Sequence, residues 1–318
     1  MNLHGKDIRV FAANSNKAVA HDIAQSLGLP LGNSDVKTFS DGEISVSIGE
    51  SVRGSDVFVV QSTSCPVNDN LMELLIMIDA FKRASAGSIT AVMPYYGYAR
   101  QDRKANARDP ISAKLVADLI TTAGADRVLT MDLHCPQIQG FFDIPVDHLR
   151  GVPVLAPYFI EKYKDMSNII CVSPDLGSVT RARNFAERLS VGLAIVDKRR
   201  QKANVCEVMN IIGDVKGKDV ILVDDMIDTA GTLCNAAKAL KEIGGANSVS
   251  ACATHGVLSG PAIDRIEQSC IEELVLLDTI NIPQEKRLAK MTVLPTAQVF
   301  AQAIERIYSD RPLSPLLS

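Results

Sequence analysis

Short apolar runs alternate with segments of helical period along almost the whole chain, and this alternation is the feature that most restricts its fold. The runs are a few residues long, as at residues 8–11, 57–60 and 169–172. Between them lie longer segments of helical period, such as residues 179–189 and 232–243. Repeated strand–helix alternation predicts parallel sheets with helices on both faces, so we expect an α/β fold.

Two strand–helix–strand segments far apart in the chain resemble each other. In the first, Asp56 starts an apolar run, a polar loop and a long helix follow, and Ser88 starts the next run. In the second, Asp219 and Ser248 hold the same two places. Such units share apolar patterning by chance, which is the alternative explanation, but we favour two copies of one domain. A chain of 318 residues is long enough for two.

Composition restricts the partners of the protein. The net charge of −4 gives no positive field that would gather nucleic acid or an anionic membrane, so we expect neither as a partner. The longest apolar runs, such as residues 74–78, are far shorter than a bilayer span. The first residues resemble neither a signal peptide nor a transit peptide, and we therefore expect a cytoplasmic protein.

The seven cysteines are odd in number, far apart and without a Cys-x-x-Cys pair. This distribution favours buried, reduced thiols that pack as small apolar groups. It speaks against disulfides and against a zinc site.

Residues 220–232 are the most informative segment. A buried strand is expected to end in Asp224 and Asp225, after which a short turn opens a helix. Unpaired N–H groups at such a turn, together with the helix dipole, suit a phosphomonoester, with the Thr229 and Thr232 hydroxyls as further donors. The two carboxylates suit the vicinal hydroxyls of a ribose, directly or through magnesium. A sugar phosphate would satisfy both halves of the segment.

The alternative is an ordinary capped helix, with Asp228 or Thr229 as its N-cap. Capping explains one Asp or Thr, but not three Asp and two Thr in nine residues.

The segment resembles the phosphoribosyl-pyrophosphate loop of the type I phosphoribosyltransferase fold, in the form found in class I ribose-phosphate pyrophosphokinases. The resemblance implies that ribose-5-phosphate is held by Asp224, Asp225, Asp228, Thr229, Ala230, Gly231 and Thr232. Ala230 is a departure, because the family usually has glycine there. Its methyl group matters if the backbone needs a positive φ at that point.

Two further segments, residues 38–43 and 98–103, resemble the family's ATP-binding stretches. Phe39 offers a ring for stacking on adenine, and Asp41 or Glu43 can accept from the adenine amino group. Arg100 and Gln101 supply donors for the phosphates or the ribose. Taken alone, either segment reads as a solvated loop. The expected ATP-binding residues are Phe39, Asp41, Gly42, Glu43, Arg100 and Gln101.

The hydrophobic period changes between residues 39 and 54. Ile44, Val46 and Ile48 alternate with polar residues, which predicts a two-stranded excursion. Its turn is expected near Gly49.

His134 follows a predicted strand, at the edge of a parallel sheet where such folds bind ligands. The resemblance implies that His134 and Asp175 are magnesium ligands. From the residues alone we would predict that His134 donates to a phosphate, because magnesium favours oxygen ligands.

Four cations stand within five residues at 198–202. Such a run is most often a solvated hairpin. Here it resembles the family's mobile catalytic loop, and the resemblance assigns catalytic roles to Lys198 and Arg200. Cations that close over a diphosphate in transfer would stabilise the transition state more than the ground state.

The resemblance implies an enzyme that moves the β,γ-diphosphate of ATP to O1 of ribose-5-phosphate, giving phosphoribosyl pyrophosphate and AMP for nucleotide, histidine and tryptophan biosynthesis. It implies two tandem phosphoribosyltransferase-like domains, at residues 1–150 and 151–295, with the C-terminal segment 296–318 packing on the first. Magnesium, a hexamer, and control by phosphate and ADP are implied as well. The C-terminal residues lack the family's usual Ser-rich ending, which leaves that control open.

Two other functions are compatible with part of this pattern. A phosphoribosyltransferase would share the turn at 228–232 but would normally lack Arg100, Gln101 and the basic loop. A non-catalytic regulatory subunit would be expected to carry damage at the ligand positions, which are intact here.

Overall fold

The computed structural model describes residues 7–199 and 208–317. These fall into two compact units. The first unit consists of Met1–Arg150, Thr279–Asn281 and Pro295–Ser318, and the second of Gly151–Asp278 and Ile282–Leu294.

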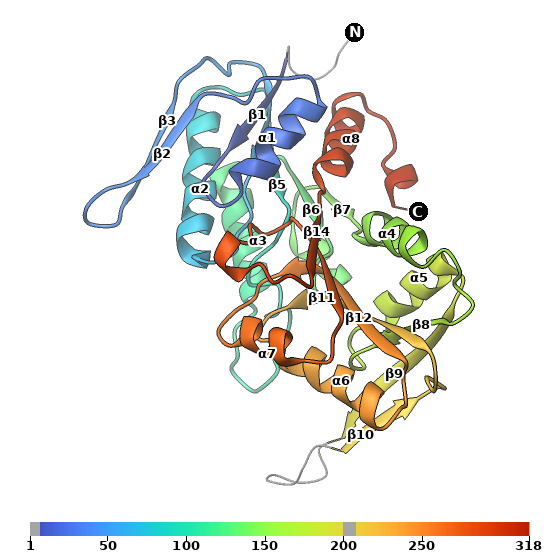
Figure 1. Cartoon of the computed structure of the whole chain (residues 1–318). Helices are drawn as coiled ribbons and strands as arrows, with labels where there is room; N and C mark the ends of the chain where they lie inside the picture. The colour runs from blue at the N-terminus through green and yellow to red at the C-terminus, as the bar shows by residue number, and fades with distance from the viewer. Residues whose placement is uncertain (1–6, 200–207, 318) are drawn as a thin grey trace. The chain divides into compact units, whose positions relative to one another are not determined.

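The first unit is built on a five-stranded sheet in which every described pair of neighbours is parallel. In spatial order the strands are β1 (Ile8–Ala12), β4 (Asp56–Val60), β5 (Ser88–Met93), β6 (Arg127–Met131) and β7 (Val146–Leu149). The helices are α1 (Lys17–Ser26), α2 (Val67–Arg83), α3 (Ser112–Ala123), α8 (Ala297–Tyr308) and the 3-10 turns η1 (Pro136–Phe141) and η3 (Ser314–Leu316). The last long helix, α8, packs on α1, as Figure 1 shows.

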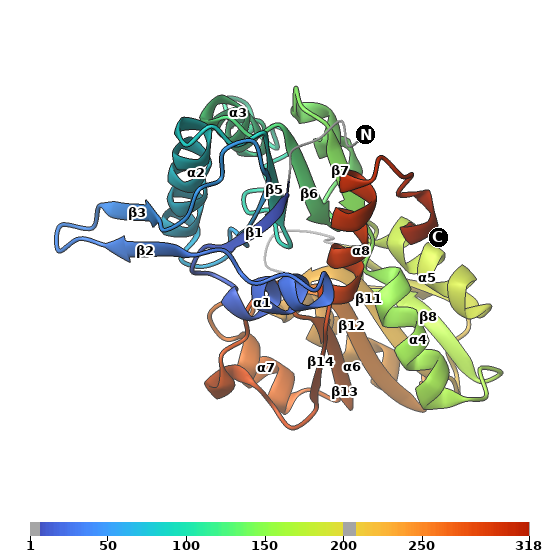
Figure 2. The same ribbon diagram turned by 90° about the horizontal axis from the view of Figure 1, so that it is seen from above.

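An antiparallel hairpin of β2 (Ser34–Thr38) and β3 (Ile44–Ile48) projects from this unit (Figure 2). Its base packs on α2. The alternation at residues 44–48 is therefore a strand, but the expected turn near Gly49 was wrong. The chain reverses at residues 39–43 instead, where Gly42 adopts a φ of 95° that other residues rarely take.

The second unit has a seven-stranded sheet that is parallel except at one edge. In spatial order the strands are β10 (Val208–Ile212), β9 (Gly192–Arg199), β8 (Ile169–Ser173), β11 (Asp219–Ile227), β12 (Ser248–Gly256), β13 (Glu273–Leu277) and β14 (Met291–Leu294). The helices are α4 (Val152–Tyr163), α5 (Val179–Leu189), α6 (Gly231–Glu242), α7 (Ala262–Gln268) and the 3-10 turn η2 (Gln284–Lys286). Among the described strands of this sheet, only β10 runs antiparallel to its neighbour. The predicted α/β class is confirmed.

The two sheets share one side-chain hydrogen bond at the same register. In the first, Asp56 of β4 lies opposite Ser88 of β5, and the serine hydroxyl donates to Asp56 Oδ1 at 2.6 Å. In the second, Asp219 of β11 lies opposite Ser248 of β12, with the same bond at 2.6 Å. An identical pair at the start of two βαβ units supports the interpretation that they are copies of one domain.

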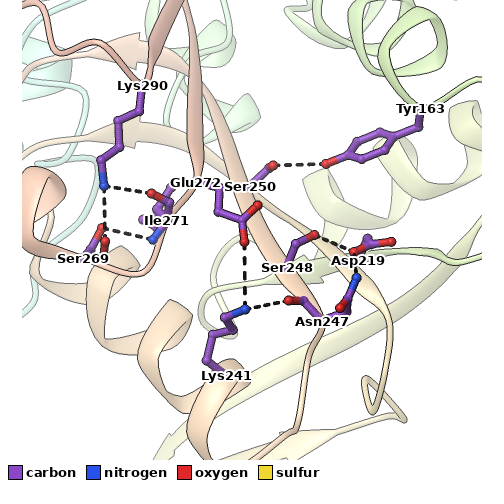
Figure 3. A network of polar contacts seen from close by, with 10 residues as sticks. All are labelled: Tyr163, Asp219, Lys241, Asn247, Ser248, Ser250, Ser269, Ile271, Glu272 and Lys290. Atoms are coloured by element: carbon purple, nitrogen blue, oxygen red, sulfur yellow. Dashed lines mark hydrogen bonds and ion pairs between the residues drawn. The ribbon is translucent and has the colours of Figure 1, made fainter.

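Polar contacts extend around Asp219 at the start of β11 and β12 (Figure 3). Asn247 donates to Asp219 Oδ1 at 2.7 Å and Asn168 donates to Oδ2 at 3.0 Å. Lys241 of α6 donates to the Asn247 carbonyl at 2.6 Å. This end of the second sheet is thus fixed by side chains, and it is the opposite end from the acidic residues of β11.

The cysteine prediction holds for only part of the set. The six described cysteines are free, and Cys171 and Cys252 are buried in the second sheet. Burial raises the pKa of Cys171 to about 12, which keeps it an unreactive thiol. Cys65 is exposed, contrary to expectation, because it precedes α2 in a loop. Cys206 lies outside the described residues.

The helices of the described residues are all too short or too polar to cross a bilayer.

Candidate active site

Asp224 and Asp225 lie inside β11 rather than after its end. The strand was expected to end in these two residues, but its pairing with β12 continues to Ile227 opposite Gly256. Its pairing with β8 ends earlier, at Leu222 opposite Val172. The end of β11 therefore overhangs β8, and the acidic residues stand on a rigid strand with one side left open by that neighbour.

The loop after β8 packs against this open side of β11 and contacts Asp224. Ser178 donates from its hydroxyl to Asp224 Oδ1 at 2.6 Å, and the Asp225 backbone N–H donates to the same oxygen at 2.8 Å. Burial and the neighbouring Asp225 carboxylate raise the pKa of Asp224 to about 8, Asp175 adds to the shift, and the Ser178 bond opposes it. The free protein therefore holds a neutral carboxyl beside ionisable ones near neutral pH.

Asp175 is fixed by the same loop. Its Oδ1 accepts from the backbone N–H groups of Gly177 at 2.8 Å and Ser178 at 3.0 Å, and the Ser173 hydroxyl donates to its carbonyl at 2.6 Å. Oδ2 makes no hydrogen bond within the described part of the chain. That oxygen is the one left for a ligand.

The turn at residues 228–232 is held from one side through its carbonyl groups. The carbonyls of Ile227 and Asp228 accept from the N–H groups of Leu258 and Ser259, both at 2.9 Å. The Thr229 carbonyl accepts from Nη1 of Arg265 at 3.0 Å. This side of the turn is thus closed by donors from the segment after β12.

The N–H groups of the same turn are not used in this way. Within residues 7–199 and 208–317, those of Thr229, Ala230, Gly231 and Thr232 have no acceptor. The side chains of Thr229 and Thr232 are exposed. Several free donors at the start of α6 can take an anion, as predicted for a phosphate.

Ala230 is the N-cap of α6 and adopts a left-handed backbone, with φ 60° and ψ 5°. The alternative in which Asp228 or Thr229 caps the helix is therefore wrong. Positive φ is also the condition under which the departure from glycine matters. The left-handed region is costly for a residue with a Cβ, so the turn carries strain here.

The candidate residues of the first unit lie in loops after neighbouring strands. Arg100 and Gln101 follow β5 and are exposed, and His134 follows β6. The Gln101 side-chain oxygen accepts from the Ser112 hydroxyl, and its carbonyl accepts from the Ala113 N–H at 3.2 Å. These contacts attach the first loop to the start of α3.

The loop after β6 has supports of its own. Gln137 Nε2 donates to Asp102 Oδ2 at 3.3 Å, which connects this loop with the one after β5. The Leu133 N–H donates to His148 Nε2 at 2.8 Å. Residues 100–102 and 134–137 therefore share one edge of the first sheet.

Phe39, Asp41, Gly42 and Glu43 form the tip of the β2–β3 hairpin. The Phe39 side chain is 57% exposed. The tip is closed by its own bonds, from Phe39 N–H to the Glu43 carbonyl at 2.7 Å and from Glu43 N–H to Asp41 Oδ1 at 3.1 Å. Among the described residues, no hydrogen bond joins the tip to the other candidate residues.

Lys198 lies in β9, opposite Met209 of β10. Arg200, the second predicted catalytic cation, lies outside the described residues. The second unit therefore brings together Asp175, Asp224, Asp225 and the 228–232 turn, whereas His134, Arg100 and Gln101 belong to the first unit.

Two residues of this site were missed from the sequence. Ser178 stands directly after the segment that contains Asp175, so a search for hydroxyl donors there would have found it. Arg265 lies in a separate helix and no sequence signal connects it with Thr229.

Comparison with known proteins gives concordant matches. Residues 8–124 match the sequence family described as the N-terminal domain of ribose phosphate pyrophosphokinase, and residues 201–318 match the phosphoribosyl synthetase-associated domain. A protein of Clostridium perfringens named ribose-phosphate pyrophosphokinase is 66% identical over 317 residues, 99% of each chain. One of Bacillus caldolyticus with the same name is 60% identical over 309 residues, 97% of each chain.

A solved structure is similar over nearly the full length. The crystal structure of phosphoribosylpyrophosphate synthetase from Mycobacterium smegmatis aligns with a TM-score of 0.91 at 46% identity. The alignment covers 96% of this chain and 100% of that one.

Proposed function

The chain belongs to the ribose-phosphate pyrophosphokinase family, and we propose that its ribose-5-phosphate binds at the 228–232 turn of the second unit. It is an enzyme that transfers the β,γ-diphosphate of ATP to O1 of ribose-5-phosphate, giving phosphoribosyl pyrophosphate and AMP. The observation that carries the site proposal is the division of the turn into two faces. The carbonyls of Ile227, Asp228 and Thr229 accept from Leu258, Ser259 and Arg265, while four successive N–H groups of the turn have no acceptor among the described residues and can bind a phosphate.

Asp224 and Asp225 would bind the ribose hydroxyls. A neutral carboxyl can donate a hydrogen bond and an ionised one can only accept. With the pKa of Asp224 raised to about 8, the pair offers both functions near neutral pH. Vicinal hydroxyls, each a donor and an acceptor, match such a pair. Ser178 would keep the Asp224 carboxyl oriented toward them.

The donor set of the second unit fits a divalent cation. Asp175 keeps one carboxylate oxygen without a hydrogen bond among the described residues. Repulsion from the Asp225 and Asp175 carboxylates contributes to the raised pKa of Asp224, and a bound cation would reduce this repulsion. No preformed group of three His, Cys, Asp or Glu ligands occurs in residues 7–199 and 208–317. That agrees with magnesium, which usually keeps water and substrate phosphates among its ligands.

The family resemblance implies Asp175 and His134 as the ligands of that ion. When bound, magnesium would supply positive charge against the β- and γ-phosphates of ATP. Lys198 and Arg200 would add cations over the diphosphate as it is transferred, with Arg100 and Gln101 donating to the nucleotide. The chain offers no obvious base for the anomeric hydroxyl, so positioning and charge stabilisation carry the chemistry in this proposal.

The exposed tip of the β2–β3 hairpin would complete the ATP site of a neighbouring subunit in a hexamer. Within the described part of the chain its hydrogen bonds are all local, and the Phe39 ring is exposed to solvent, where it could contact another chain. Activation by phosphate and inhibition by ADP follow from the family resemblance, and they stay predictions, as does the cytoplasmic location.

The test follows AMP and phosphoribosyl pyrophosphate in a mixture of the protein, ATP, ribose-5-phosphate and magnesium. AMP should appear only when the sugar phosphate is present. Asp224→Asn should abolish ribose-5-phosphate binding, while Asp264→Asn, an exposed carboxylate of α7, should bind as the parent protein does. Unchanged binding by the Asp224→Asn variant would refute the proposed site.

A further inference from the structure

Arg265 contacts the 228–232 turn from the side opposite its free N–H groups. It comes from α7, and its Nη1 donates to the Thr229 carbonyl at 3.0 Å. Building on the proposed sugar-phosphate site, we propose that Arg265 is a positioning residue. It fixes the Thr229–Ala230 peptide so that the Ala230 N–H faces the phosphate.

The argument starts from the planarity of that peptide. In a trans peptide the carbonyl of one residue and the N–H of the next point in opposite directions. Because Arg265 binds the Thr229 carbonyl, the Ala230 N–H must point away from Arg265. The carbonyls of Ile227 and Asp228 are bound on the segment after β12 in the same manner, so Arg265 extends a series that Leu258 and Ser259 begin.

The backbone strain at Ala230 explains why the Arg265 hydrogen bond to the Thr229 carbonyl is needed. With φ at 60°, Ala230 is in the left-handed region. A residue with a Cβ has a lower conformational energy at negative φ. A flip of the Thr229–Ala230 peptide would return this φ to the negative range. The flip would also turn the Thr229 carbonyl, an acceptor, toward the bound phosphate. The Arg265 bond is lost in the flip and therefore opposes it.

Gly231 lets the arginine come this close. A Cβ built at Gly231 would lie 3.3 Å from Arg265 Nη1, which is tighter than most such contacts. The guanidinium also borders a hollow of about 530 Å³ that Lys238 and Cys234 line. Lys238 is thus a cation of the same neighbourhood, and no contact joins it to the turn in the described part of the chain.

Three variants distinguish positioning by the Arg265 hydrogen bond from a general effect of positive charge near the turn. Arg265→Gln should weaken ribose-5-phosphate binding about tenfold by calorimetry, as expected for loss of a charged hydrogen bond, and raise the KM for that substrate without changing the KM for ATP. Arg265→Lys, which keeps the charge but not the planar fork, should fall between it and the parent. Lys238→Gln should bind as the parent does. Equal weakening by Lys238→Gln and Arg265→Gln would overturn the proposal, as would an Arg265→Gln variant that binds normally.

A double-mutant cycle with Ala230→Gly tests the role of strain. Glycine takes a positive φ without cost, so Arg265→Gln should weaken binding only about threefold in the Ala230→Gly background. A full tenfold loss in that background would contradict the bracing mechanism. If the parent protein itself fails to bind ribose-5-phosphate, the proposed site is wrong. If the parent binds and the Arg265 variants match it, only the role of Arg265 is wrong.

Discussion

The Ser178 hydroxyl donates a hydrogen bond of 2.6 Å to Oδ1 of Asp224, and so connects the start of α5 with the overhanging end of β11. The Ser178 backbone N–H donates at the same time to Asp175, at 3.0 Å. One residue therefore orients both a proposed metal ligand and a proposed ribose ligand. Asp175 and Asp224 are therefore connected through Ser178.

Asp224→Asn should stabilise the metal-free protein at alkaline pH while abolishing ribose-5-phosphate binding. The folded protein keeps the Asp224 proton up to about pH 8, whereas the unfolded chain loses it near pH 4, so this carboxyl lowers stability as pH rises between those values. We expect the free energy of unfolding of the variant to exceed that of the parent by about 2 kcal/mol at pH 8 and by much less at pH 5. Urea unfolding with EDTA present measures both.

The matched control is Asp264→Asn, which should change stability by less than about 0.5 kcal/mol at either pH. A gain from Asp224→Asn that is the same at pH 5 and pH 8 would show that titration of this carboxyl is not its cause.

Ala230→Gly should stabilise the protein by about 1 kcal/mol, because it removes the left-handed strain, less the added freedom of glycine in the unfolded chain. Ribose-5-phosphate binding should be equal or tighter. Thermal unfolding and calorimetry measure the two effects. Ala237→Gly, in the interior of α6, should instead destabilise. Loss of stability in Ala230→Gly would mean that the turn does not hold this backbone in solution.

Asp219→Asn should destabilise the second unit by about 1–2 kcal/mol at pH 7. Burial disfavours the charge of Asp219, but hydrogen bonds from Ser248, Asn247 and Asn168 outweigh burial and lower its pKa. A lowered pKa contributes stability above the ordinary value near pH 4, and that stability is lost as pH falls through the folded pKa. The difference between variant and parent should therefore shrink below about pH 4. A difference independent of pH would contradict the assignment.

Much of this architecture follows from local sequence. The strand expected at residues 169–172 and the helix expected at 179–189 are found as β8 and α5, because a buried run and a clear helical period leave few alternatives. The edge strands β7, β10 and β14 were missed. They are short and only partly buried or mixed in composition, so their existence depends on a neighbouring strand rather than on their own pattern.

In the candidate site, too, some features follow from local sequence and others depend on tertiary packing. The donors and carboxylates of residues 224–232 were predicted, since strand, turn and helix follow one another in the sequence. The positive φ of Ala230 and the bond from Arg265 to Thr229 were not, because both depend on how the segment after β12 packs. Sequence indicated which groups are present, and tertiary structure decides which of their faces are free.

Phe39→Ala should raise the KM for ATP about tenfold, in line with the cost of losing an aromatic ring from a base stack. Stability should change little, because the ring is 57% exposed. Initial rates over a range of ATP concentrations measure the effect. Ile243→Ala, which removes an apolar side chain that is 69% exposed in the second unit, should leave the KM unchanged.

Subunit mixing tests whether the hairpin tip serves a neighbour. Co-expressed Phe39→Ala and Asp224→Asn chains should form mixed assemblies that are more active than either variant alone at low ATP. Each Phe39→Ala chain then has an intact sugar-phosphate turn and can receive an intact tip. Activity that equals the average of the two variants would place the tip at its own chain's site.

Lys198→Ala should lower the rate of diphosphate transfer about 10³-fold, the scale of losing a cation that stabilises a transferring phosphoryl group. Ribose-5-phosphate binding should be nearly unchanged, since the 228–232 turn is intact. Rapid-quench measurement of AMP formation separates the two quantities. Lys238→Ala is the control for removing a lysine from the same unit, and an unchanged rate in Lys198→Ala would remove that residue from the mechanism.

The unequal pairing of β11 has a consequence for how such an enzyme can change. Beyond Leu222 the strand pairs with β12 and no longer with β8. The backbone position of Asp224 and Asp225 is therefore set by β12 and does not depend on the loop after β8. The loop at residues 174–177 can change in length or sequence without displacing the backbone of Asp224 and Asp225. The backbone position of the proposed sugar-binding pair can therefore persist while the proposed metal-binding loop changes, provided that the Ser178 hydrogen bond to Asp224 is kept.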